Sequence, residues 1–496
     1  MDPVFGRNRK MGRVAAPVTD RRNMESSRLI NLPIELHTSI LKFVLAITGR
    51  SIDSNFPIQE CWEIGRSLYY HSDLPAYDRR MPWMEKKLHE NLIFPFNVAD
   101  VCQLWRDILV GIPEYWHRVV FDVAKDPTRF LDAFSWSKNR EGIEIFIFNS
   151  TSIVQDVDRA LESARVFAIT EALKPHIQRC KFIIYHLTYS SSLPPPNIFL
   201  SQEMPLLEDL TLDSRVDDIG LVDAPSYTME LYNSFPMLKT LWLTGFWFFF
   251  LARLSDPVWL MEFRGAESML LQLTRFTFPK HGSYCLPQFM SYLEMMEDAF
   301  TYIYLSDLSL EYPHDYSDES DPRPEDVFFL SSDMHFNHVS KDFIAQLIAI
   351  TDLEVTESLS FTNCEVPYFK RNPGGDLLTL EGIIDDDNSN SLRNIVKIWG
   401  GHEITFRSCP SLNDKFLLWL ASETKLPADG RVLQHPCFPA HLLTFLTISN
   451  CPSFSQKSLQ QLVEVRKVVR YDEGLRSVIV DGRCMRTEEE NTSVYR

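Results

Sequence analysis

The feature that most constrains the fold is a short apolar–polar alternation that recurs along the chain from about residue 205 onward. Leucine, isoleucine or phenylalanine at every second position is typical of a strand with one buried face. Most intervals between copies hold an apolar helical segment, as at residues 343–350, 414–421 and 455–465. One strand and one helix cannot bury their apolar faces alone, so the copies must stack on one another. The copies are residues 207–212, 238–243, 273–278, 305–310, 358–361, 403–406 and 443–448.

The last copies continue into a shared turn sequence. Residues 405–412 align with residues 447–454, and residues 361–364 are a partial third copy. This pattern resembles the cysteine-containing class of leucine-rich repeat, in which an Asn or Cys turns inward after the strand. The resemblance implies an α/β fold, an irregular leucine-rich-repeat solenoid with a parallel concave sheet over residues 205–482. An ordinary α/β domain with chance leucine spacing is the alternative.

The segment before these copies, residues 122–204, alternates helix with strand. The patterns predict strands over Ile143–Phe148 and Cys180–Leu187, and helices over Phe130–Lys138 and Val157–Gln178. We expect this α/β segment to link the N-terminal helices to the repeats and to cap the first repeat.

The N-terminal part carries two short amphipathic helical patterns. Pro33 stands where the first helix begins, so the loss of its backbone N–H is harmless, and Glu35 follows where the helix dipole favours an acid. Asn97 is a candidate cap for the second helix, and Pro113 opens a short third segment. Helices this short cannot bury their stripes on each other alone, so they need a partner surface. The stripes are Leu36, Ile40, Leu41, Val44 and Leu45 in the first helix, and Val98, Val101, Cys102, Trp105, Ile108 and Leu109 in the second.

The order and spacing of these residues resemble the F-box family, whose pattern is Leu-Pro-x-Glu-Leu, Ile-Leu, Val-Cys-x-x-Trp-Arg-Asp-Ile and Pro-x-x-Trp. These elements stand at residues 32–36, 40–41, 101–108 and 113–116. The second half is most similar to the variant abundant in mushroom-forming fungi. By periodicity alone, the same helices are ordinary core material. The resemblance implies a small all-α module over residues 28–121 that binds a Skp-type adaptor through Leu32, Pro33, Leu36, Ile40, Leu41, Val101, Cys102, Trp105 and Trp116.

The two halves of this pattern stand further apart than is usual in the family. A segment from about residue 48 to 95 intervenes, and its prolines at 57, 75 and 82 break any continuous helix. We expect this insert to loop away from the adaptor-binding face. The ends of the chain are predicted to be a disordered basic tail over residues 1–27 and a flexible tail over residues 483–496.

Composition and charge disfavour several classes of partner. The net charge of −18 is the wrong sign for neutralising phosphates, which disfavours nucleic-acid binding. The most apolar stretch, residues 241–251, is too short to span a bilayer, and no secretory signal opens the chain. The 9 cysteines form no Cys-x-x-Cys pair. We therefore expect an intracellular chain with reduced thiols, cytoplasmic and/or nuclear, without a membrane partner.

The reactive side chains suggest no catalytic site. The sequence lacks a phosphate-binding glycine loop, a nucleophile elbow and a zinc-binding His-Glu-x-x-His helix, and its histidines have no ligand spacing. The acidic runs at residues 315–321 and 385–387 lack the spacing of a calcium loop and are read as solvated insertions. We predict no enzyme activity, no cofactor and no metal.

The F-box resemblance implies a substrate-recognition subunit of a cullin-RING ubiquitin ligase. The adaptor would connect it to the cullin and the RING protein, and the repeats would bind a protein target. The alternatives are a non-degradative F-box scaffold and a plain leucine-rich-repeat interaction module. Period-two alternation predicts target contacts at Lys239, Trp242, Arg407 and Ser449, beside Asp209, Thr211, Thr240, Thr277, Thr405 and Thr447. Trp242 could instead pack on the aromatic run at residues 247–250 as core.

Overall fold

The structure is a computed structural model, and it describes most of the chain in separate ranges. These are residues 32–49, 95–220, 235–254, 269–295, 300–314, 328–369, 372–383, 391–422, 439–467 and 475–486. Both predicted tails, apart from residues 483–486, lie outside these ranges. Residues 50–94, which form nearly all of the predicted insert, and both acidic runs also lie outside them.

The described residues form one sheet of 14 strands, and its spatial order is the order of the strands in the sequence. Neighbouring strands pair in parallel from β1 to β13, whereas β13 and β14 pair antiparallel. The fold is therefore α/β with a parallel sheet, as predicted. The strands are β1 Arg118–Asp122, β2 Ile143–Phe148, β3 Cys180–Tyr189, β4 Asp209–Val216, β5 Thr240–Thr244, β6 Met269–Phe278, β7 Phe300–Leu310, β8 Phe328–Asn337, β9 Asp352–Thr362, β10 Leu377–Glu381, β11 Glu403–Arg407, β12 Phe445–Ser449, β13 Ser477–Val480 and β14 Arg483–Arg486.

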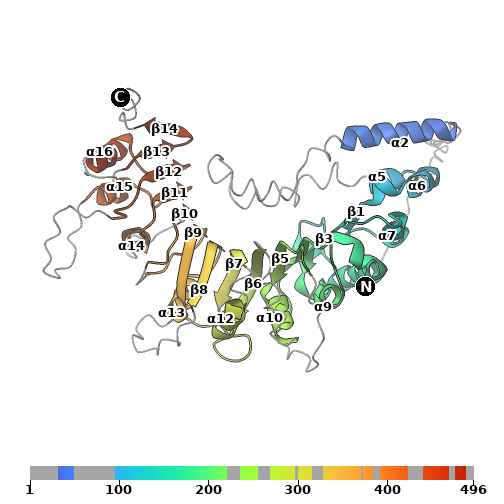
Figure 1. Ribbon diagram of the computed structural model, residues 1–496, viewed down its shortest axis with the longest axis horizontal. Coiled ribbons are helices and arrows are strands. Elements are labelled where there is room, and N and C mark those ends of the chain that lie inside the picture. Colours follow the sequence, from blue (N-terminus) through green and yellow to red (C-terminus); the bar gives the residue numbers. More distant parts are fainter. Residues whose placement is uncertain are drawn as a thin grey trace, which may run out of the picture.

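The sheet curves into an arc, and helices line its outer side (Figure 1). Helix α10 contacts β5 and β6, and α13 contacts β7 and β9. At one end of the arc, helices α2, α5 and α6 precede β1. The helices are α2 Ile34–Gly49, α5 Phe96–Ala99, α6 Gln103–Val110, α7 Ala133–Trp136, α8 Arg159–Leu173, α9 Asn197–Leu200, α10 Gly245–Leu254, α12 Leu286–Met295, α13 Lys341–Ile350, α14 Ser391–Ile398, α15 Asp414–Leu420 and α16 Gln456–Lys467. Short 3-10 turns are η1 Pro113–Trp116, η2 Thr128–Phe130, η3 Val154–Asp156, η4 Lys174–Arg179 and η5 Ser190–Ser192.

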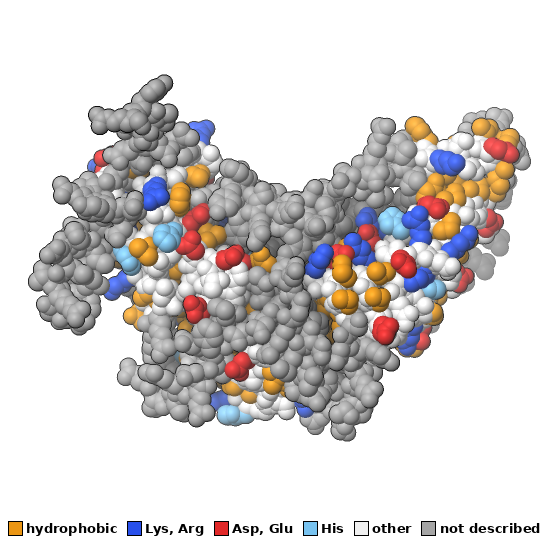
Figure 2. All heavy atoms as spheres, in the orientation of Figure 1, with side chains coloured by type: hydrophobic (Ala, Val, Ile, Leu, Met, Phe, Trp, Pro, Cys, Tyr) orange, Lys and Arg blue, Asp and Glu red, His pale blue; other side chains and the backbone are white. Residues whose placement is uncertain are grey.

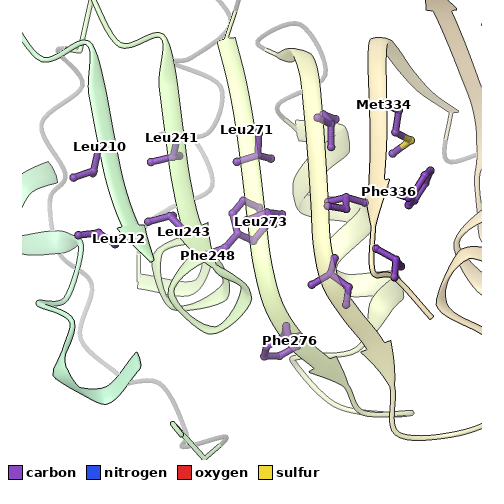
Figure 3. Close-up of a cluster of buried hydrophobic side chains, with 14 of the residues drawn as sticks. Leu210, Leu212, Leu241, Leu243, Phe248, Leu271, Leu273, Phe276, Met334 and Phe336 are labelled. Atoms are coloured by element: carbon purple, nitrogen blue, oxygen red, sulfur yellow. The ribbon is translucent and has the colours of Figure 1, made fainter. Parts of the chain in front are cut away.

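The core is built from aligned apolar rows between the sheet and the outer helices. Leu210, Leu241 and Leu271 occupy one register position on neighbouring strands (Figure 3). The same row continues in both directions and takes one buried residue from each strand between β1 and β13. Its members are Val119, Ile145, Ile183, Leu210, Leu241, Leu271, Ile303, Met334, Leu359, Leu378, Ile404, Leu446 and Val478.

Each strand from β6 to β12 reaches a left-handed backbone residue at one shared register position, which lies inside β6 and β7 and directly after the last residue of β8 to β12. The φ angles of the non-glycine residues lie between 50° and 54°, and Gly382 has a φ of 61°. The bend turns the next side chain back toward the core, as for Phe276, Leu308 and Cys364. Asn, Asp and Gly adopt this conformation most readily, which explains much of the turn sequence. The bend residues are Arg275, Asp307, His338, Asn363, Gly382, Ser408 and Asn450.

The chain ends its sheet in a tight hairpin. Val480 pairs with Arg483, so only Asp481 and Gly482 form the loop between β13 and β14. Their φ angles are 46° and 76°. An Asp-Gly loop with positive φ at both residues is the usual two-residue connection of antiparallel strands.

The predicted early elements agree with the structure in part. The strand at Ile143–Phe148 is confirmed, and the predicted helix over Val157–Gln178 is α8 followed by η4. The predicted helix over Phe130–Lys138 is only the four-residue α7, preceded by η2. Residues 118–204 contribute β1, β2 and β3 to the common sheet. These strands form one continuous array with β4 and the strands that follow it.

Candidate protein-interaction sites

Helix α2 carries two apolar stripes, one facing the protein and one facing outward. Pro33 precedes the helix, and its carbonyl accepts hydrogen bonds from the backbone N–H groups of Leu36 and His37. His37, Leu41 and Val44 form the inner stripe, with His37 and Leu41 fully buried. Leu36, Ile40 and Phe43 form the outer stripe. The predicted single stripe through Leu36, Ile40 and Val44 is therefore wrong, because the helical turn of 100° per residue carries Val44 to the inner face.

A hydrogen bond joins the two halves of the helical region. The indole N–H of Trp105 donates to Nδ1 of His37 over 2.9 Å. Trp105 is half-buried, and the two rings meet edge to face with centroids 6.4 Å apart. Sequence reasoning missed His37, although its spacing of four from Leu41 and seven from Val44 places it on the inner stripe.

The second predicted helix is broken into two. Helix α5 ends at Ala99, and α6 begins at Gln103 after Cys102, whose extended backbone (φ −160°, ψ 161°) caps α6. The predicted cap Asn97 lies inside α5 instead. The break lets Phe96 and Leu109 face the core while Val101, at the turn, faces outward.

Trp116 fixes the helices to the first strand of the sheet. Its fully buried indole donates to the carbonyl of Leu109 over 2.9 Å. Its ring lies 5.3 Å from the ring of Phe96 and 4.5 Å from that of Trp136. Phe96 in turn lies 5.7 Å from Phe121 of β1. The helices thus share one core with the sheet and leave their outward stripe uncovered.

The outward residues form a candidate docking surface for another protein. Ile34, Leu36 and Phe43 are 56%, 49% and 66% exposed, and Val101 is 64% exposed. Figure 2 shows hydrophobic side chains gathered at the end of the molecule where these helices lie. Isolated exposed apolar residues are ordinary, but a stripe of them on one helix is typical of an interface. We call Leu36, Ile40 and Phe43 the outer α2 stripe.

The structure places the predicted adaptor-binding residues in three groups. Pro33, Leu36 and Val101 are exposed, whereas Leu41 and Trp116 are buried supports. The remaining four, Leu32, Ile40, Cys102 and Trp105, are half-buried.

The sheet face opposite the apolar rows, which lines the inside of the arc, carries the predicted target contacts. We call it the inner face. Thr211 and Trp242 are register partners on it, and so are Arg407 and Ser449. Six strand spacings separate Trp242 on β5 from Arg407 on β11, which is roughly 29 Å. The predicted contacts therefore form two separate groups.

Trp242 and Lys239 differ from the prediction. Trp242 is only 6% exposed, because it lies between the neighbouring strand residues Thr211 and Gln272. Its ring does not join the main core cluster. Lys239 precedes β5, and its ammonium pairs with the Glu208 carboxylate at 3.3 Å. Lys239 is three residues from Trp242, so the two cannot share one face of a strand. Thr277 lies beyond the bend at Arg275 and is exposed, while its neighbours Phe276 and Phe278 are buried, in agreement with the predicted alternation.

The pKa values of two buried carboxylates on β4 are shifted in opposite directions. Burial alone would raise the pKa of Asp213, but Arg275, His186 and Thr274 hold it below its usual value. Thr274 donates to Asp213 over 3.0 Å, and His186 Nδ1 lies 2.9 Å from the same carboxylate. Burial raises the pKa of Asp209 to about 7, although the Thr211 hydroxyl donates to it over 2.7 Å.

We expect Asp209→Asn to stabilise the protein at alkaline pH. The folded chain holds the Asp209 proton up to about pH 7, whereas the unfolded chain releases it near pH 4, so stability falls as pH rises between these values. Because asparagine cannot ionise, the variant should have a free energy of unfolding up to about 4 kcal/mol higher than wild type at pH 8, and little different from it at pH 4. Urea denaturation at both pH values measures this difference. Asp213→Asn is the matched control and should lose stability at pH 8, because the lowered pKa of Asp213 makes its charge stabilising there.

Comparison with known proteins adds no assignment to these surfaces. No model of a known protein family matches the chain, and no curated protein matches it. Within the described ranges, no group of three or more His, Cys, Asp or Glu side chains is arranged to hold a metal ion. No helix in the described part combines the length and apolar character that crossing a bilayer requires.

Proposed function

We propose that the chain is a substrate-recognition subunit of a cullin-RING ubiquitin ligase, with an F-box over the N-terminal helices and leucine-rich repeats over the sheet. The single observation that carries this proposal is the outer α2 stripe. It begins at the last residue of a Leu-Pro-x-Glu-Leu sequence, and its Leu36 and Phe43 stay exposed although the inner stripe of the same helix is packed. An adaptor of the Skp type would cover these apolar side chains. The adaptor would connect the chain to the cullin and the RING protein.

The repeat arrangement supports the second part of the proposal. One apolar row crosses β1 to β13, and the bend recurs at one register position from β6 to β12. The thiol of Cys364 accepts a hydrogen bond from the backbone N–H of Val339 over 3.4 Å. This is the contact to a neighbouring bend that the cysteine-containing repeat class implies. The inner face would then hold a protein target close to the ligase, where proximity and orientation favour transfer to a target lysine.

Adaptor binding by the full chain tests the proposal. We expect the double variant Leu36→Glu with Phe43→Glu to lose on the order of a hundredfold or more in affinity for a purified Skp-type adaptor, since interface anchors contribute about 2 kcal/mol or more each. The control is Phe167→Glu on α8, a side chain that is 67% exposed and outside the proposed surface. It should bind like wild type. No binding by the wild-type chain, or equal weakening in the control, would contradict the proposal.

A second measurement separates the ligase receptor from the two alternatives. Affinity purification of wild type and of the double variant should give the same target protein, while adaptor and cullin disappear from the variant. If the target carries ubiquitin only when wild type is present, the receptor function holds. A target that is never ubiquitylated favours a scaffold, and a wild-type chain that never recovers adaptor favours a plain interaction module.

A further inference from the structure

Two cysteines occupy the same position on adjacent strands near the C-terminal end of the sheet. Arg407 of β11 and Ser449 of β12 are register partners. Each is followed by a left-handed bend residue, Ser408 or Asn450, and then by Cys409 or Cys451. Neighbouring strands lie roughly 4.8 Å apart. This spacing falls within the Cα separation of about 4.4–6.8 Å that a disulfide needs.

The two cysteines have free thiols and already contact each other through a hydrogen bond. The backbone N–H of Cys409 donates to the sulfur of Cys451 over 3.4 Å. The Cys409 sulfur lies 3.1 Å from the carbonyl oxygen of Leu380 and is fully buried, whereas Cys451 is half-buried. Cys364 occupies the equivalent bend on β9, but its neighbour on β10 is Ile383. It therefore has no thiol on that side.

The environments of the two sulfurs assign them different roles. The hydrogen bond with the Cys409 thiol lowers the pKa of Cys451, while the same bond together with burial raises the pKa of Cys409. The thiolate is the nucleophile in thiol chemistry, so the partly exposed Cys451 is the sulfur that an oxidant would meet first.

We propose that Cys409 and Cys451 form a peroxide-sensitive pair that oxidises to a reversible disulfide. The Cys451 thiolate attacks one oxygen of hydrogen peroxide, the O–O bond breaks, and sulfenic acid and hydroxide form. Cys409 then attacks the Cys451 sulfur, forming the S–S bond and breaking the S–O bond. The hydroxide of the first step takes the proton that Cys451 released on ionising, and the hydroxide that leaves in the second step takes the Cys409 proton. One peroxide is thus reduced to two waters for each disulfide.

The disulfide would act directly beside the predicted target contacts. It would join β11 to β12 two residues beyond Arg407 and Ser449, and would lock the two bends together. It would form whether or not the N-terminal helices bind an adaptor, so its test is independent of the proposed function.

Mass spectrometry of the full chain tests this pair. The reduced protein is exposed to hydrogen peroxide at neutral pH, free thiols are alkylated, and the digest is analysed without reductant. We expect one main linked pair, Cys409 with Cys451, that dithiothreitol reverses. Cys102, which is also half-buried, is the internal control and should remain several times more alkylated than Cys451.

Two variants test the order of events. Cys409→Ser should stop at Cys451 sulfenic acid, trapped by dimedone, and Cys451→Ser should leave Cys409 reduced. Circular dichroism checks that both variants fold. If either variant does not fold, the digest of the oxidised wild-type protein tests the proposal alone. Oxidation of Cys451 no faster than Cys102, or a disulfide to a different cysteine, would overturn the proposal.

Discussion

Replacing Trp116 with alanine is expected to lower the free energy of unfolding by about 3–5 kcal/mol, which is typical of a fully buried tryptophan. The indole is fully buried and contacts Phe96 and Trp136 at centroid distances of 5.3 and 4.5 Å. Its removal opens a cavity where the helices meet the sheet. It also leaves the carbonyl of Leu109 without the indole donor. Urea denaturation followed by circular dichroism measures the loss.

Two controls separate the cavity from a general effect of substitution. Trp116→Phe keeps much of the ring volume and should lose clearly less than Trp116→Ala. Tyr368→Ala removes an aromatic side chain that is 62% exposed and should change stability by no more than about 0.5 kcal/mol. A Trp116→Ala chain as stable as wild type would show that the helices are not anchored through this ring.

Arg466→Met is expected to cost about 3–5 kcal/mol at the opposite end of the chain, because leaving a buried carbonyl without its donor costs about 1–3 kcal/mol and Arg466 serves several. The Arg466 guanidinium is buried on α16 and donates to the carbonyl of Leu420 from Nε over 3.3 Å and to that of Ala440 from Nη1 over 3.2 Å. It also donates to the carbonyl of Pro439. Methionine fills a similar volume but donates nothing, so buried carbonyls would lose their donors.

The loss should be local, because repeat arrays unfold from unit to unit. Hydrogen exchange should therefore increase most in α15, α16 and β12, with little change near β1. Lys457→Met on the exposed side of α16 is the matched control and should be nearly neutral. Arg466→Lys should remain clearly destabilised, since one ammonium cannot reproduce the guanidinium fork.

Seven of the ten strands from β4 to β13, and their parallel stacking, could be predicted because period-two alternation depends only on which face is buried. Strands β8, β10 and β13 correspond to none of the predicted copies. The copies at residues 238–243 and 443–448 overlap β5 and β12, and their predicted core side chains Leu241 and Leu446 are buried. The bends could be predicted only in part. Asn363 and Asn450 suit a left-handed backbone, but Arg275 and Ser408 adopt it without the usual residue type, because the neighbouring strands require the turn there.

The candidate sites were harder to predict, since exposure depends on neighbours that sequence does not place. Alternation put Trp242 on the inner face but could not show that the adjacent strands leave it 6% exposed. The spacing of apolar residues along α2 could not separate the inner residues from the outer ones, because the same helix carries both. His37 was missed because its partner, Trp105, stands 68 residues away in the sequence.

The closing hairpin has a consequence for self-association. A parallel array has two unlike ends, and a bare last strand could accept the first strand of another copy and start a head-to-tail filament. Here β14 runs against β13 through the Asp481–Gly482 loop, so the final edge presents the opposite chain direction. An incoming β1 in the orientation of the array would be antiparallel to β14, whereas the strands from β1 to β13 pair in parallel. We expect this reversal of polarity to keep the chain from polymerising through its sheet.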